Sequence, residues 1–495
     1  MTGLVRTDRL DPEAIAEITA GRWLTPPDPQ RTILGAAIDS RDVRPGNIFF
    51  AFKGAHTDGH AHLEAAARAG AATLILETRP PDLSAQLRKH PGAGVLLVKN
   101  SADAIASLAA GYRREITGVR TIGVTGSNGK TTAVRLIHAA LKAARLRGSH
   151  SLKSHNNSLG VPLTILNADP ADDYLICEIG TSSPGEIRPL AKMVRPEIGV
   201  ITSVGRAHLE SLGSIAGVAR EKAELVRALD ASSVAIITGD SPELDTEIGR
   251  QIPCRVIRVG ISPDSDVVVS AIKTHLGQTS FLACKRRMEI SLPGAHNACN
   301  AAIALTVAKS LGVDLEKAAV GLAAATGPEM RLEQSTLPIR GGSIHLINDA
   351  YNANPESMNA AIREFAAGSL DPACESAPTS KSPPPRRVAV LGSMLELGDQ
   401  ADGAHKEIVD LIAGFKSIGL AVFIGPDFAR AQQSDPKFRF LAEDSGGDPA
   451  NKTAWPASVA AWLLDGDIVL LKGSRGARLE RLIGAACSRQ PDAVG

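Results

Sequence analysis

Residues 125–132 read Thr-Gly-Ser-Asn-Gly-Lys-Thr-Thr and join two stretches of different pattern. Residues 119–124 are short, β-branched and apolar, which predicts a buried parallel strand, and residues 133–144 carry apolar residues at helical spacing. A glycine-rich turn there points backbone amides and the positive end of the helix dipole at an anion. Lys130 can reach the outer phosphates of a nucleotide, and the Thr131 hydroxyl is placed to bind a phosphate-bound Mg²⁺. The stretch predicts a nucleotide site, although Gly123 lies one residue too far from Gly129 for the general Walker spacing.

Composition limits the classes of protein to consider. A chain of 495 residues is too long for one ordinary core and predicts two to four domains. A net charge of +1 and an aromatic content of 3% give no reason to expect binding to nucleic acid. The six cysteines form no CxxC pair, so reduced thiols in a cytoplasmic protein are expected. No apolar run has the length of a membrane span, and the charged N-terminus is not a signal peptide.

Three segments alternate between strand and helix patterns, which predicts an α/β protein of three domains. Residues 1–115 form a small N-terminal α/β domain, residues 116–328 a central parallel sheet around the phosphate loop, and residues 329–495 a Rossmann-like domain. Within the last, residues 369–387 are rich in Pro and Ser and predict a mobile surface insertion. Residues 267–292 alternate more like antiparallel strands.

Local patterns predict individual elements within these domains. In the first domain we expect helices at 12–19, 64–69 and 102–115, and strands at 31–38, 47–52, 73–76 and 94–98. In the second, strands are expected at 174–179, 198–203 and 234–238, with helices at 185–193, 214–229, 297–311 and 315–325. In the third, strands are expected at 344–348, 388–391, 422–424 and 468–471.

The carboxylate of Glu178, in the central segment, could complete the coordination of a Mg²⁺ ion. Glu178 ends a predicted strand, and the carboxyl ends of parallel strands gather ligands at the edge where the phosphate loop lies. Taken alone, however, Glu178 is more often a strand-end cap, His208 a surface or hydrogen-bonded histidine, and Lys222 a solvated helix lysine. Their residue types alone do not decide between these alternatives.

Polar residues further along the chain could contact a nucleotide or a second substrate. Asn297 and Asn300 lie three residues apart and share a helix face, where their amides could read an adenine edge, although helix N-capping by Asn297 is an alternative. Arg331 follows a Gly-Pro break and could clamp a phosphate between domains, with an ordinary surface arginine as the default. Residues 349–355 read Asp-Ala-Tyr-Asn-Ala-Asn-Pro, a polar loop typical of ligand binding or of local turn chemistry.

With these stretches together, the chain resembles the Mur ligases of peptidoglycan synthesis over nearly its whole length. In the first domain the resemblance rests on Asp39-Ser40-Arg41, Pro45-Gly46, Phe49, Lys53-Gly54 and Asp58-Gly59-His60. In the second it rests on the phosphate loop, Asn156-Asn157, Glu178-Ile179-Gly180, Gly185-Glu186-Ile187, Ala207-His208-Leu209-Glu210, Lys222, Asn297 and Asn300. In the third, residues 349–355, Ser357-Met358, Met394-Leu395-Glu396-Leu397-Gly398 and Lys472-Gly473-Ser474-Arg475 have the form found in the family's D-alanyl-D-alanine-adding members.

The resemblance implies a role for each of these residues. It implies that Thr125, Gly126, Ser127, Asn128, Gly129, Lys130, Thr131, Thr132, Asn297, Asn300, Arg331 and Asp349 bind ATP. It implies that Ser40, Arg41, Lys53, Asp58, Gly59, His60, Asn156, Asn157, Tyr351, Asn352 and Asn354 bind substrate. Thr131 and Glu178 would hold one Mg²⁺, and His208 with a carbamylated Lys222 a second. Lys130, Glu178, His208, Lys222 and Arg331 would form the catalytic set.

The implied reaction is an ATP-dependent ligation of D-Ala-D-Ala to UDP-MurNAc-tripeptide through an acyl phosphate, in a cytoplasmic and monomeric enzyme. Alternatives are another ligase of this group, such as the tripeptide-forming enzyme or one acting on folate-like substrates, and a P-loop regulator or phosphotransferase. An Asp-Asn-Pro-Arg element typical of the tripeptide-forming members does not occur. Lys153-Ser154 and Ser393 depart from the usual family residues, as does the 369–387 insertion.

Overall fold

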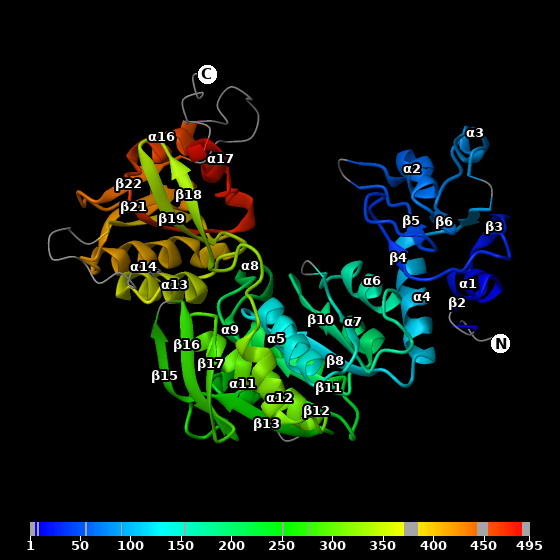
Figure 1. Ribbon diagram of the computed structural model, residues 1–495, viewed down its shortest axis with the longest axis horizontal. Coiled ribbons are helices and arrows are strands. Elements are labelled where there is room, and N and C mark those ends of the chain that lie inside the picture. Colours follow the sequence, from blue (N-terminus) through cyan, green and yellow to red (C-terminus); the bar gives the residue numbers. More distant parts are fainter. Residues whose placement is uncertain are drawn as a thin grey trace.

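The computed structural model describes residues 5–6, 9–54, 57–90, 92–152, 155–249, 252–275, 277–370, 385–442 and 454–487. Three α/β units follow one another along the chain and form three lobes, with the central unit between the other two (Figure 1). Most of the 369–387 insertion lies outside the described residues. Within the described part of the chain, no helix is long and apolar enough to cross a membrane.

The N-terminal unit is built on a five-stranded sheet in the order β3-β7-β6-β5-β4. Its strands are β3 (Arg22–Thr25), β4 (Ala36–Ala37), β5 (Ile48–Phe50), β6 (Thr73–Leu76) and β7 (Gly94–Leu97), and a short pair, β1 (Val5–Arg6) with β2 (Arg9–Leu10), precedes it. Its helices are α1 (Pro12–Thr19), the 3₁₀ turn η1 (Gly59–His62), α2 (Leu63–Arg68), α3 (Leu83–Leu87) and α4 (Ser101–Glu115). All strand pairs of the five-stranded sheet are parallel except β3 with β7.

Capping chemistry explains the best prediction in this unit. The Asp11 carboxylate accepts hydrogen bonds from the backbone of Glu13 and Ala14, and Pro12 fills the first helical position, so the helix at 12–19 is confirmed. The strand expected at 31–38 is wrong except for Ala36–Ala37. Gly35 has φ +66°, which ends the extended backbone just before that pair.

The central unit has a seven-stranded, wholly parallel sheet in the order β14-β13-β12-β11-β8-β10-β9. The strands are β8 (Arg120–Thr125), β9 (Gly148–His150), β10 (Tyr174–Glu178), β11 (Ile198–Ile201), β12 (Val234–Thr238), β13 (Arg255–Gly260) and β14 (Val267–Val268). The helices are α5 (Lys130–Ala143), α6 (Gly160–Leu166), α7 (Ile187–Val194), α8 (Leu209–Leu212), α9 (Ile215–Arg227), α10 (Pro242–Ile248), α11 (Ala295–Ser310) and α12 (Leu315–Ala323).

Both faces of this sheet are buried. Along β10, Leu175 and Cys177 join one apolar core while Tyr174 and Ile176 join the other, as expected for a strand covered by helices on both sides. A separate antiparallel sheet of β15 (Ser270–His275), β16 (Gln278–Ala283) and β17 (Arg286–Ile290) confirms most of the antiparallel prediction. Residues 267–268 are the exception, because β14 pairs in parallel with β13.

The C-terminal unit has a six-stranded sheet in the order β18-β19-β23-β20-β21-β22. Its strands are β18 (Glu333–Ile339), β19 (Gly342–Asp349), β20 (Arg387–Gly392), β21 (Ile418–Ile424), β22 (Phe438–Leu441) and β23 (Ile468–Lys472). Its helices are α13 (Pro355–Ala367), the 3₁₀ turn η3 (Gly398–Gln400), α14 (Ala401–Ala413), α15 (Pro426–Arg430), α16 (Ala454–Trp462), the 3₁₀ turn η4 (Arg475–Ala477) and α17 (Arg481–Cys487). Only β18 with β19 is antiparallel, so the third strand–helix alternation is confirmed as a mainly parallel sheet.

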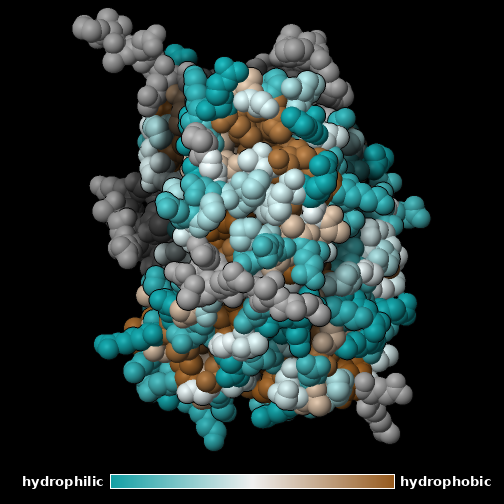
Figure 2. Space-filling model, turned by 90° about the vertical axis from the view of Figure 1, so that its right-hand side faces the viewer, coloured by the Kyte–Doolittle hydropathy of each residue, from teal (hydrophilic) through white to brown (hydrophobic). Residues whose placement is uncertain are grey.

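The units are joined by specific contacts. Tyr112 of α4 donates a hydrogen bond from its hydroxyl to the Ala168 carbonyl at 2.6 Å, and one apolar core runs from the N-terminal unit into the central one. On the face carrying the N-terminal unit, apolar side chains occur in small groups separated by polar ones (Figure 2). The sheet order brings the carboxyl ends of β8, β10 and β11 to one edge, where the candidate site lies.

Candidate active site

The phosphate loop is held by buried polar contacts. Thr125 ends β8, Lys130 begins α5, and Lys130 Nζ donates a hydrogen bond to the Gly126 carbonyl at 2.7 Å. Gly126 has φ +153°, and a Cβ there would lie 2.0 Å from Thr202 Oγ1. Gly129 has φ +82°, and a Cβ there would meet the Asn300 amide at 2.8 Å. Both positions therefore require glycine, and the loop is fixed against its neighbours before any ligand binds.

Neighbouring groups shift the pKa of Lys130. Desolvation lowers the pKa of its ammonium group, the Glu178 carboxylate opposes this, and the Arg331 guanidinium adds to the lowering. An anion arriving between Lys130 and Arg331 would relieve their mutual repulsion. Electrostatics at this position therefore favour a phosphate.

Glu178 lies beside this loop at the end of β10. Its Oε1 accepts a hydrogen bond from Asn156 Nδ2 at 2.8 Å, which orients the carboxylate. Its Oε2 is buried and lacks a hydrogen-bond partner within the described part of the chain, as does the neighbouring Thr125 Oγ1. Buried oxygens are rarely left unpaired, and hard cations prefer oxygen ligands, so this donor set fits a Mg²⁺ ion.

His208 and Lys222 have different environments. His208 adopts φ +56° at the start of α8, and its Nδ1 contacts the Glu396 carboxylate of the C-terminal unit. Lys222 is only 1% exposed, and desolvation, followed by repulsion from Lys130, lowers its pKa well below the ordinary value. Among the described residues, no group of three or more His, Cys, Asp or Glu side chains could hold a metal ion by itself. A second metal site would therefore need additional oxygen ligands.

Two cavities meet at this site. The loop cavity, about 340 Å³, lies between the phosphate loop, the start of α11 and the face of α13. The strand-end cavity, about 780 Å³, lies between α4, Asn156, Glu178 and His208. Three residues line both cavities: Lys130, Arg331 and Asn352.

The start of α11 forms one wall of the loop cavity. Asn297 lines it, and the Asn297 amide donates a hydrogen bond to the Pro293 carbonyl at 2.7 Å. The capping alternative for Asn297 is wrong, because the helix begins earlier and Gly294 is the N-cap residue. Asn300 is buried against Gly129 rather than in the cavity. The two amides share a helix face as expected, but only Asn297 faces the cavity.

The loop at residues 349–355 forms the opposite wall. The Asp349 carboxylate pairs with Lys472 Nζ at 2.6 Å, with both side chains at the carboxyl ends of neighbouring strands. Tyr351 lines the strand-end cavity, and its ring lies beneath Arg331 with 4.6 Å from Cζ to the ring centroid. Asn354 caps α13 through Ser357, so this part of the loop also carries the local turn chemistry weighed as an alternative.

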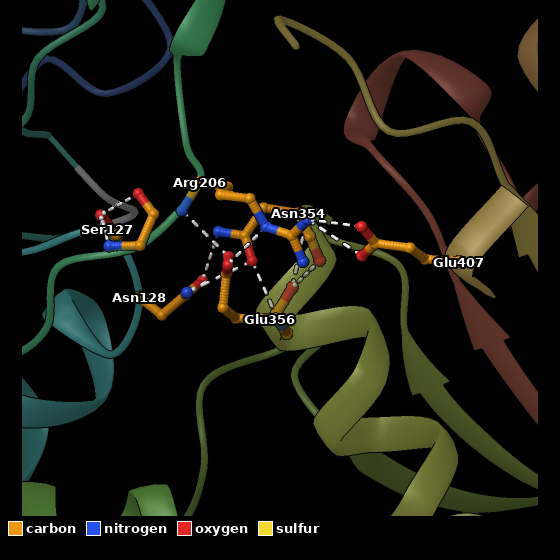
Figure 3. Close-up of polar contacts among 8 residues, drawn as sticks. Ser127, Asn128, Arg206, Asn354, Glu356 and Glu407 are labelled. Carbon is orange, nitrogen blue, oxygen red and sulfur yellow. Dashed lines mark hydrogen bonds and ion pairs between the residues drawn. The ribbon is translucent and has the colours of Figure 1, made fainter. Parts of the chain in front are cut away.

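The C-terminal unit contacts the phosphate loop directly (Figure 3). Asn354 Nδ2 donates to Asn128 Oδ1 at 2.8 Å, and Asn128 Nδ2 donates back to Asn354 Oδ1 at 3.3 Å. Arg206 donates from its backbone N–H and from Nε to the two oxygens of Glu356, and its Nη1 reaches Glu407. No local sequence pattern marks Arg206, Glu356 or Glu407, because the partners lie 150 and 201 residues apart.

The remaining predicted substrate residues lie apart from this junction or have structural contacts. Ser40, Arg41, Lys53, Asp58, Gly59 and His60 line neither of the two cavities. Arg41 pairs with Asp39, and the Asp58 carboxylate accepts from the His60 backbone and contacts His60 Nδ1. Asn157 lines the strand-end cavity and caps the turn before α6. Lys153-Ser154 lie outside the described residues, and Ser393 is buried at the end of β20.

Comparison with known proteins covers all three units. Family models match at residues 32–113 (Mur ligase family, catalytic domain), 124–308 (Mur ligase middle domain) and 330–475 (Mur ligase, glutamate ligase domain). The chain is 32% identical over 95% of its length to the UDP-N-acetylmuramoyl-tripeptide–D-alanyl-D-alanine ligase of Bacillus subtilis, covering 96% of that protein.

Solved structures of similar proteins agree with the match to the Mur ligase family. MurF from Acinetobacter baumannii superposes with a TM-score of 0.76 at 25% identity, covering 97% of this chain and 98% of that one. The MurF ligase of Thermotoga maritima in complex with ADP gives 0.70 at 26% identity, covering 92% and 97%. The expected three-domain α/β architecture and the resemblance are confirmed, and the chain belongs to the Mur ligase family.

Proposed function

We propose that the protein is an ATP-dependent ligase that adds D-Ala-D-Ala to UDP-MurNAc-tripeptide in peptidoglycan synthesis. The observation that carries this function is the similarity to UDP-N-acetylmuramoyl-tripeptide–D-alanyl-D-alanine ligases, which are 32% and 33% identical over 95% and 93% of the chain. The site supports it independently, because two cavities of ligand size meet at Lys130 and Arg331. We further propose the domain boundaries 1–115, 116–328 and 329–495.

A carboxylate is a poor electrophile, so one of its oxygens must first become a leaving group. In the proposed reaction, a C-terminal carboxylate oxygen of the tripeptide attacks the γ-phosphorus of ATP, and ADP leaves. The amine of D-Ala-D-Ala then attacks the acyl carbon of the acyl phosphate and loses a proton. The tetrahedral intermediate releases inorganic phosphate and leaves an amide.

Placing ATP in the loop cavity and the tripeptide carboxylate in the strand-end cavity assigns the chain's own groups. The phosphate loop backbone would bind the β- and γ-phosphates, with Lys130 and Arg331 at the point where the two anions meet. Asn297 would contact the adenine, and Asp349, fixed by Lys472, would face the ribose side. Closure by α13 would keep water from the acyl phosphate.

Two Mg²⁺ ions complete the proposal. Thr131 and Glu178 would hold the first, and His208 and Lys222 the second, with Nε2 as the ligand atom of His208 because Glu396 occupies Nδ1. When bound, the ions neutralise phosphate charge as the two anions approach. The lowered pKa of Lys222 favours its neutral amine, which can attack CO₂ and lose a proton to give an anionic carbamate.

The substrate assignments of the N-terminal unit complete the scheme. Ser40, Arg41, Lys53, Asp58, Gly59 and His60 would bind the UDP end. Asn156, Asn157, Asn352 and Asn354 remain predicted substrate contacts. We also propose a cytoplasmic location, where ATP and UDP-linked precursors occur, and a monomeric enzyme.

Phosphate release with ATP, Mg²⁺ and UDP-MurNAc-tripeptide, with and without D-Ala-D-Ala, tests this function. Release that requires the dipeptide, with a pentapeptide product by mass, is expected. Turnover only with a single amino acid and a shorter UDP-peptide would assign the chain to a different reaction of the family. No phosphate release with any amine would make a nucleotide-binding regulator the better explanation.

A further inference from the structure

The wall between the two cavities is where the transferred phosphoryl group must pass, given the proposed function. Only Lys130, Arg331 and Asn352 line both cavities among the described residues. Lys130 is fixed by its bond to the Gly126 carbonyl. Arg331 belongs instead to the segment that links the central and C-terminal units, so its position must be set by other contacts.

The Arg331 guanidinium has a single aromatic contact. Its Cζ lies 4.6 Å from the centroid of the Tyr351 ring. Within the described part of the chain, no carboxylate forms an ion pair with Arg331 and no hydrogen bond from its side chain occurs. A guanidinium stacked on a ring is held in one plane while the N–H donors on its edge remain able to meet an anion.

The backbone around Arg331 is constrained on both sides. Met330 has φ +56° and Leu332 has φ +53°, two left-handed residues other than glycine that flank one arginine. The Tyr351 backbone N–H donates to the Met330 carbonyl at 3.2 Å, and Arg475 Nη1 contacts Met330 Sδ at 3.0 Å. The same residue that supplies the ring therefore also ties down the strained backbone next to Arg331.

We propose that Tyr351 is the positioning residue for Arg331, holding its guanidinium at the junction so that its N–H edge meets the phosphoryl group in transfer. This proposal rests on the proposed function and changes the part given to Tyr351, which was predicted from the resemblance to contact substrate. Tyr351 acts here through its ring face and backbone N–H. Its hydroxyl carries none of the effect.

A double-mutant cycle on ligation tests the proposal. Tyr351→Leu removes the ring and should lower kcat by about 10- to 100-fold, because misplacing a group by about 1 Å costs that much. The dissociation constants for ADP and for UDP-MurNAc-tripeptide, measured by calorimetry, should stay within about 2-fold. Tyr351→Phe keeps the ring and should retain kcat within about 3-fold. In an Arg331→Ala background, Tyr351→Leu should cost less than 3-fold more, since the two residues act as one unit.

Other results would overturn the proposal. Losses that multiply in the double variant would show that Tyr351 acts independently of Arg331. A weaker binding of UDP-MurNAc-tripeptide to Tyr351→Leu with normal kcat would make Tyr351 a substrate contact, and an equal loss in Tyr351→Phe would make its hydroxyl the active group.

A structural readout separates this proposal from the proposed function. Crystal structures of Tyr351→Phe and Tyr351→Leu with ADP should show Arg331 over the ring in the first and displaced in the second. An undisplaced Arg331 in Tyr351→Leu would refute the positioning role whatever reaction the protein catalyses. Wild-type inactivity with D-Ala-D-Ala would refute the proposed function alone.

Discussion

The phosphate loop and the predicted UDP-binding residues of the N-terminal unit differ in how firmly their neighbours hold them. The backbone of the loop is fixed by buried neighbours such as Thr202, which donates to the Asn128 carbonyl, and Asn300, which lies against Gly129. Around Arg41, by contrast, the polar groups are exposed and paired with close neighbours in sequence such as Asp39. A rigid buried loop suits a reacting group that needs exact placement. Exposed side chains suit a part of the substrate that is bound but does not react. Three measurements test this difference, and a fourth tests the stability of the helix that follows the loop.

The largest effect is expected at Lys130. Lys130→Ala removes one of the two cations that line both cavities, so ligation should fall by at least about 10³-fold, the scale seen when transition-state charge loses its partner. Phosphate release measures this. Lys142→Ala, an exposed lysine in the last turn of the same helix, serves as the control and should retain full turnover. Near-normal turnover of Lys130→Ala would contradict the assignment of the active site.

Gly126→Ala probes the rigidity of the loop without removing a charge. The added Cβ would lie 2.0 Å from Thr202 Oγ1 at φ +153°, so the loop must shift and ATP affinity should fall by about 100-fold. Calorimetry with ATP measures the affinity. Gly118→Ala adds the same atom where nothing lies within 4 Å and should leave affinity unchanged. Equal ATP affinities for the two variants would mean that the phosphate loop adapts to the added atom and is not rigid.

Arg41→Ala tests the exposed side of the comparison. Because its ion pair with Asp39 is solvent-exposed, thermal stability should not change measurably. The KM for UDP-MurNAc-tripeptide should rise by about 10-fold with kcat unchanged, the pattern of a lost uniform binding contact. The exposed Arg44→Ala is the control. A fall in kcat without a change in KM would show that Arg41 helps to align the reacting groups.

The smallest effect is expected at the far end of α5. Burial lowers the pKa of His138 to about 4, with His150 adding to the shift, and its Nδ1 contacts the Tyr174 hydroxyl at 2.9 Å. A depressed histidine pKa means that the unfolded chain binds more protons between pH 6.5 and 4, so stability should fall as pH drops through that window. Allowing for solvent screening, we expect a loss of about 1 kcal/mol. Urea unfolding of wild type and His138→Gln at pH 5 and 7.5 measures this loss in the free energy of unfolding. An equal pH dependence in both proteins would mean that groups other than His138 cause the acid sensitivity.

Sequence patterns predicted the parts of the site that are local along the chain. The strand, glycine turn and helix around Lys130 are confirmed because each is specified by its own residues and their neighbours. The capping alternative for Asn297 failed because Gly294 is the N-cap residue, and the Asn297 amide donates instead to the Pro293 carbonyl. The Arg206–Glu356 pair and the stacking of Arg331 on Tyr351 could not be predicted from the sequence, because pairing between distant segments depends on how two folded units meet.

The contact between Asn128 and Asn354 has a consequence for how the C-terminal unit moves. The amide pair is neutral, whereas Arg206 holds Glu356 and Glu407 through charge. Added salt weakens an ion pair that solvent reaches but leaves a neutral amide pair almost unaffected. Raising the ionic strength should therefore loosen the contacts of Arg206 and leave the Asn128–Asn354 pair in place, so that the start of α13 stays on the phosphate loop.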